Sequence, residues 1–114
     1  MSDKKYLKQE VKKIVKDIAT HYDPLQIIIF GSLVNAQKKE CDDIDLVVIK
    51  KTNERFLNRS KALVKLIKSD EPIDFFVYTP EEIELAKSQN NLFIINEILK
   101  KGKVIFEKGT FYEF

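Results

Sequence analysis

The sequence contains few of the residues that cross-link a chain or interrupt its helices and strands. Its 114 residues include one cysteine, three glycines, three prolines and no tryptophan. A single cysteine, Cys41, excludes a disulfide within the chain and leaves no second cysteine for a zinc site. The scarcity of glycine and the 44% of hydrophobic residues exclude a disordered chain. We therefore expect one compact domain over residues 1–114.

The sequence also lacks long apolar runs and an excess of one charge. No run is long enough to cross a bilayer, and the charged N-terminus has no apolar core typical of a signal peptide. We therefore expect a cytoplasmic protein with no membrane contact. The 20 basic and 18 acidic residues give a net charge of only +2, and the basic residues are spread along the chain. Direct nucleic-acid binding is therefore not expected.

Helical and strand patterns alternate along the chain. Apolar residues at three- and four-residue steps predict amphipathic helices over 3–21 and about 53–69. Short apolar runs predict strands over 25–30, 44–49, 73–78 and 104–107. This alternation is typical of the α/β class, with a small mixed or parallel β-sheet flanked by helices.

A further helix is predicted after the third strand. Thr79 is a good N-cap, with Pro80 at the first helical position and Glu82 completing a capping box. Helical sequence continues to about residue 101, with a break at 89–91 left open. The aromatic tail over 110–114 is expected to pack back on the domain, with docking of a partner as the alternative.

The central stretch, residues 27–49, contains a glycine–serine corner, Gly31-Ser32, followed by two aspartates. Gly31 ends an apolar run, where the missing Cβ permits a tight turn and close approach of a ligand. A helix from Ser32 to about residue 38 would point free N–H groups and the hydroxyl outward, which suits an anion. Asp43 and Asp45 are two apart on a strand, so their side chains would leave the same face. Two such carboxylates suit Mg²⁺ that also binds substrate phosphates.

A third carboxylate, Asp74, interrupts an apolar strand. Burying it unpaired would be costly, so it should face a cleft, a cation or solvent. On a neighbouring strand it could join Asp43 and Asp45, bind one metal ion and accept the proton of an attacking hydroxyl. Each aspartate alone is more often a turn or cap residue. Together with the glycine–serine corner, the three predict a two-metal site for phosphoryl or nucleotidyl transfer.

Those residues carry a family resemblance. Gly31-Ser32, ten intervening residues and then Asp43-x-Asp45 resembles the DNA polymerase β-like nucleotidyltransferase superfamily, and the short chain resembles its minimal nucleotidyltransferase (MNT) branch. The resemblance covers nearly the whole chain and implies a nucleotidyltransferase fold like the polymerase β palm. It implies transfer of AMP from ATP to a hydroxyl with Mg²⁺, two ions in all. Gly31 and Ser32 would contact the triphosphate. Asp43, Asp45 and Asp74 would hold the metal ions and act in catalysis.

Minimal members of this superfamily resemble the antitoxin half of a toxin–antitoxin pair. The resemblance implies a HEPN ribonuclease toxin as partner, silenced when AMP is attached to one of its tyrosines. Two other functions remain open. One is a binding module with a degenerate site that neutralises the toxin by occlusion. The other is an enzyme for a small acceptor such as an aminoglycoside, which is less favoured because such relatives generally carry a further helical domain.

The sequence departs from the family pattern after the serine. Many relatives have an arginine soon after it and a glycine further on, where this chain has Leu-Val-Asn-Ala over 33–36. A lost arginine removes a phosphate contact, since its planar fork binds phosphate through two nitrogens. Asn35, Lys38 or Lys39 could compensate.

Three other chemistry-bearing residues are expected to take no part in the site. His21 stands at a helix end with no partner in the motif, and Cys41 lies in a loop. Arg59 lies four residues after Arg55 on the same helical face. The two could reach phosphate or an acidic partner, but we expect ordinary exposure at the surface.

Overall fold

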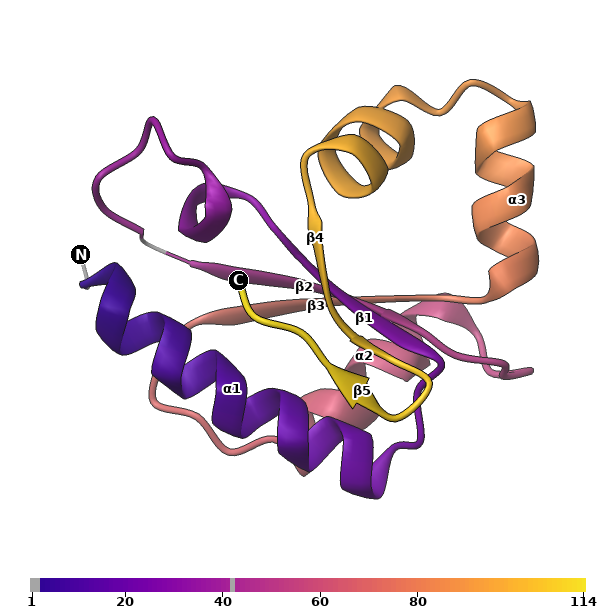
Figure 1. Cartoon of the computed structure of the whole chain (residues 1–114). Helices are drawn as coiled ribbons and strands as arrows, with labels where there is room; N and C mark the ends of the chain where they lie inside the picture. Colours follow the sequence, from indigo (N-terminus) through magenta and orange to yellow (C-terminus); the bar gives the residue numbers. More distant parts are fainter. Residues whose placement is uncertain (1–2, 42) are drawn as a thin grey trace.

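The computed structural model describes residues 3–41 and 43–114, so Asp42, the last residue of the predicted loop before the second strand, lies outside the described residues. A five-stranded sheet in the order β3-β2-β1-β4-β5 forms the centre of the molecule (Figure 1). Its strands are β1 (Gln26–Phe30), β2 (Ile44–Ile49), β3 (Ile73–Tyr78), β4 (Lys103–Glu107) and β5 (Thr110–Phe111). Strand β2 runs parallel to β3 and the other pairs are antiparallel. The predicted small mixed sheet is confirmed.

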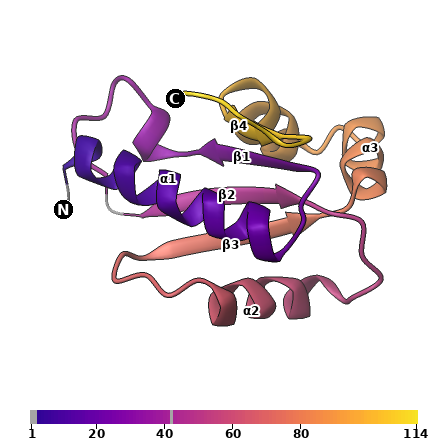
Figure 2. The same cartoon turned by 60° about the horizontal axis from the view of Figure 1, so that its bottom comes forward.

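Helices cover the two faces of this sheet. They are α1 (Lys4–His21), the 3₁₀ turn η1 (Ser32–Val34), α2 (Phe56–Leu66), α3 (Pro80–Ser88) and the π-helix η2 (Phe93–Lys100). Figures 1 and 2 show α1 and α2 on one side of the sheet, with α3 and η2 near its other face. No helix in the described part of the chain is long and apolar enough to span a membrane.

The period of two along each strand divides the core between these faces. Alternate residues of β1 and β2, such as Ile29 and Leu46, pack under α1 and α2. Their neighbours, such as Ile28 and Val47, pack under α3 and η2. Strands covered on both faces read as continuous apolar runs, which is why the sequence located them well.

Two predicted helices are shorter in the structure. The helix expected from residue 32 to about 38 is only the three-residue turn η1, and α2 spans 56–66 rather than about 53–69. The capping box before α3 is confirmed: Thr79 Oγ1 accepts from the N–H of Glu82 at 3.1 Å, and Glu82 Oε1 accepts from the N–H of Thr79 at 2.8 Å. The break that the sequence left open at 89–91 is present and separates α3 from η2.

Arg59 is buried, so the prediction that it lies at the surface is wrong. Its Nη1 donates to Glu82 Oε1 at 2.7 Å and to the carbonyl oxygen of Val77 at 3.1 Å, and its Nε donates to that of Glu54 at 2.9 Å. The side chain thus joins α2, β3 and α3. Val77 and Glu82 lie 18 and 23 residues from Arg59 in the sequence, so helical spacing alone could not reveal them.

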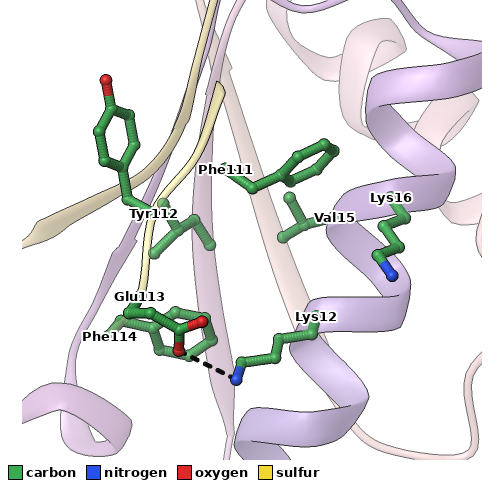
Figure 3. Close-up of a pocket in the computed structure, with 8 residues that line it drawn as sticks. Lys12, Val15, Lys16, Phe111, Tyr112, Glu113 and Phe114 are labelled. Carbon is green, nitrogen blue, oxygen red and sulfur yellow. Dashed lines mark hydrogen bonds and ion pairs between the residues drawn. The ribbon is translucent and has the colours of Figure 1, made fainter. Parts of the chain in front are cut away.

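The aromatic tail packs back on the domain, as predicted. Phe114 packs against the core beneath α1, and Glu113 forms an ion pair with Lys12 at 3.1 Å (Figure 3). The side chains of Phe111 and Tyr112 remain about half exposed. A pocket of about 210 Å³ lies between α1 and this tail. Its lining has one carboxylate, that of Glu113, which is paired with a lysine, so it is a poor candidate for metal chemistry.

Candidate active site

Two of the predicted carboxylates meet in the sheet. Asp45 of β2 and Asp74 of β3 are partners in the parallel register. Residues two further along, Val47 and Phe76, belong to the core on the face of α3 and η2, so the aspartates project from that face too. The sequence pattern thus correctly placed Asp45 and Asp74 side by side.

The environment of Asp45 is unfavourable for a free carboxylate. The residue is about half buried. Burial, then the negative charges of Asp74 and Asp43, and finally a hydrogen bond with the Asp74 side chain raise its pKa from 3.8 to about 6. A cation bound between the carboxylates would relieve this repulsion.

Asp43 lies outside the strand that carries Asp45, although the sequence predicted both on one strand. It is exposed and precedes β2, which begins at Ile44, so it is not a strand neighbour of Asp45. Over residues 3–41 and 43–114, no group of three or more His, Cys, Asp or Glu is close enough to hold a metal ion. The structure therefore gathers a pair of carboxylates rather than three. The metal-binding role of Asp43 stays a prediction.

Gly31 lies directly beside Asp45 of the Asp45–Asp74 pair. Its φ of 83° lies in the region that favours glycine, and a Cβ built there would be 2.4 Å from Asp45 Oδ2. The contact arises because Phe30, the last residue of β1, is the register partner of Asp45. The backbone conformation thus favours glycine, and a Cβ would also force the Asp45 carboxylate to shift.

Ser32 and Cys41 form a short hydrogen-bonded chain next to the corner. The Ser32 hydroxyl donates to Cys41 Sγ at 3.1 Å, and the thiol donates to the carbonyl oxygen of Asp43 at 2.8 Å. Cys41 is fully buried. The Ser32 hydroxyl therefore points to the cysteine rather than outward, and Cys41 is no incidental loop residue. Sequence reasoning missed both contacts because residues 38–40 of the loop are exposed, whereas Cys41 itself is buried in the hydrophobic core.

An open pocket of about 620 Å³ adjoins the corner. Residues 31–32 and 34–38 line it together with Glu97 and Lys101 from the end of η2. Lys4 of α1 donates hydrogen bonds to the carbonyl oxygens of Asn35 at 2.8 Å and of Lys38, which ties this loop to the domain. Lys101 could not be recognised as a site residue from the sequence, because only the fold brings η2 beside the corner.

Comparison with known proteins identifies the family. Residues 12–110 match the family model described as polymerase beta, nucleotidyltransferase. The chain belongs to this nucleotidyltransferase family. The crystal structure of a predicted nucleotidyltransferase from Sulfolobus solfataricus has a similar fold, with a TM-score of 0.68 at 17% identity, over 96% of this chain and 88% of that one. No curated protein matches the chain in sequence.

The site suits the divalent metal that nucleotidyltransferases generally use. Asp45 and Asp74 supply hard oxygen donors. Burial, followed by the negative charges of Asp74 and Asp43, raises the pKa of Asp45. Mg²⁺ is commonly held by only one or two carboxylates plus substrate phosphates, so this pair is sufficient. A bound metal ion would neutralise the triphosphate and stabilise the leaving pyrophosphate.

Proposed function

We propose that this nucleotidyltransferase transfers AMP from ATP to a tyrosine hydroxyl of a HEPN-type ribonuclease toxin and so acts as its antitoxin. The observation that carries the transfer chemistry is the Asp45–Asp74 pair lying against Gly31. The toxin as acceptor is supported by the resemblance of the short chain to minimal nucleotidyltransferases.

Each residue of the site has a part in this reaction. Asp45 and Asp74 bind Mg²⁺, with Asp43 as a further ligand. Asp74 is exposed, so it can reach an incoming acceptor and take the proton of its hydroxyl. The hydroxyl oxygen bonds to the α-phosphorus of ATP, the bond to the bridging oxygen breaks and pyrophosphate leaves. Gly31 leaves room for the Asp45 carboxylate, which a Cβ at this position would meet at 2.4 Å.

Apolar surface beside the site supports a protein as acceptor. Phe93 of η2 is 44% exposed and packs edge-on against Phe30 at 5.8 Å between ring centroids. Phe30 in turn is the register partner of Asp45, and Leu92 is 67% exposed. A partner protein could bury these side chains while presenting a hydroxyl to Asp74.

The proposed transfer is tested by measuring the mass of the partner protein. The chain is incubated with the candidate toxin, ATP and Mg²⁺, and the toxin is measured by intact-mass spectrometry. We expect a gain of one or more AMP groups on tyrosine with the wild type and none with Asp74→Asn. An unmodified toxin that nevertheless stays bound to the wild-type chain would refute the transfer.

A second function, neutralisation by occlusion, is favoured by two observations in the loop. Residues 33–36 contain no arginine, and the Ser32 hydroxyl is engaged by Cys41. Combining Asp43→Asn with Asp45→Asn separates the two functions. Neutralisation that survives these changes would indicate occlusion, whereas its loss with folding and binding intact would indicate chemistry.

A further inference from the structure

The pocket beside the corner needs a cation if it is to hold a triphosphate. A nucleoside triphosphate carries several negative charges, and the loop over 33–36 supplies no basic residue. In the structure two lysines line the pocket, Lys38, which follows this loop by two residues, and Lys101 at the end of η2. Of these, Lys101 comes from an element that the family motif does not include.

The backbone of Lys101 is held firmly against the sheet. The N–H of Gly102 donates to the carbonyl oxygen of Ile98 at 3.1 Å. The N–H of Lys101 donates at 3.1 Å to the carbonyl oxygen of Asn96, five residues earlier, which is the π-helical pattern. A Cβ on Gly102 would lie 2.3 Å from the Ile98 oxygen and 2.8 Å from Ile28 Cγ2 of β1. The helix end therefore packs on the strand that leads into the corner. π-helical turns are frequent at functional sites.

The side chain of Lys101 is held by a partner that it can exchange. Its Nζ lies 3.0 Å from Glu97 Oε1, one turn earlier, and 69% of the lysine side chain is exposed. Exposed pairs of this kind contribute little to stability. A triphosphate entering the pocket offers a higher negative charge than one carboxylate, so it can take the ammonium group from Glu97.

We propose that Lys101 binds the triphosphate of the nucleotide in this pocket and supplies the positive charge that the loop over 33–36 lacks. This inference rests on the proposed nucleotidyl transfer. Glu97 holds the ammonium group in the nucleotide-free protein and competes with the phosphates. Lys101 thus determines affinity for the phosphate chain rather than for the base or the sugar.

The experiment compares nucleotide affinities by isothermal titration calorimetry with Mg²⁺ and no partner protein. The probes are a non-hydrolysable ATP analogue and AMP. We expect Lys101→Ala to weaken analogue binding about tenfold or more, the range of a lost charge-assisted contact, and to leave AMP affinity unchanged. Lys100→Ala is the matched control, because Lys100 is a neighbouring exposed lysine that does not line the pocket. Lys101→Arg should restore affinity.

A second variant is expected to act in the opposite direction. Glu97→Gln removes the competing carboxylate and should tighten binding of the analogue a few-fold. Equal analogue affinities for wild type, Lys101→Ala and Lys100→Ala would overturn the inference, as would a wild-type protein that binds no analogue. If the analogue binds in a Lys101-dependent way but no partner gains AMP, the inference stands and the proposed acceptor is wrong. If AMP transfer is undiminished in Lys101→Ala at limiting ATP, the inference alone fails.

Discussion

Asp45 on β2 and Asp74 on β3 lie directly opposite each other across a parallel strand pair. This pairing puts two negative charges on the sheet face that carries α3 and η2, with Gly31 against the first of them. The folded chain therefore bears an electrostatic cost at this point that a bound cation would offset.

The first prediction concerns the stability cost of Asp45. Its pKa of about 6 in the folded chain lies above the ordinary 3.8, so the native state holds the proton more tightly than the unfolded chain. Stability therefore falls as pH rises through this window and stays lower above it. We expect Asp45→Asn to raise the Tm of the metal-free protein at neutral pH.

The gain should be on the order of 1 kcal/mol, since solvent screens a half-exposed group. It should shrink when the pH is lowered to about 4, where the wild-type carboxyl is already protonated. Asp17→Asn, an exposed site on α1, is the control and should change little. A Tm of Asp45→Asn that is lower than wild type at neutral pH would contradict the prediction.

The second prediction separates the two reasons for glycine at position 31. Gly109 has a similar φ of 85°, but a Cβ there would meet nothing within 4 Å. Gly109→Ala should thus show only the backbone cost, about 1 kcal/mol. Gly31→Ala adds the clash with Asp45 and should cost about 2–3 kcal/mol or more. Urea denaturation of both variants measures the difference, and equal losses would show that the carboxylate simply moves aside.

The third prediction concerns Arg59, which links α2, β3 and α3. Arg59→Ala leaves Glu82 and the Val77 carbonyl without this donor, and we expect a loss of about 3 kcal/mol. Arg55→Ala is the matched control, because Arg55 is exposed, and it should cost about 0.5 kcal/mol or less. Chemical denaturation followed by circular dichroism compares them. Similar losses would mean that the pair of Arg59 and Glu82 contributes nothing specific.

The same ion pair should be sensitive to acid. The hydrogen bond from Arg59 is the main cause that lowers the pKa of Glu82 below its ordinary 4.5. The contribution of the pair is therefore present above pH 4.5 and is lost as pH falls through the lowered pKa. Below that pH the difference in stability between wild type and Glu82→Gln should diminish.

Much of the fold could be predicted from the sequence because its signals are local. Strands β2 and β3 were located at their observed bounds, and the capping box of Thr79 and Glu82 marked the start of α3. The pairing of Asp45 with Asp74 was also anticipated, since both interrupt apolar strands at equivalent positions. Periodicity and capping depend on neighbouring residues, so they can be read without the tertiary structure.

What the sequence could not show depends on contacts between distant segments. The burial of Arg59 requires Glu82, and the role of Cys41 requires the turn at Ser32. The approach of Lys101 to the corner requires η2 to pack on β1. The end of η1 was also missed, because the backbone becomes extended at Asn35 and nothing in the local sequence marks that change.

The fourth prediction tests the carboxylate pair directly by paramagnetic broadening of backbone amide signals on titration with Mn²⁺. Mn²⁺ prefers the same oxygen ligands as Mg²⁺. We expect the broadening to centre on Asp45, Asp74 and Gly31, and to disappear in Asp45→Asn combined with Asp74→Asn. Broadening centred on another acidic surface, or left unchanged in the double variant, would show that this pair is not the metal site of the nucleotidyltransferase.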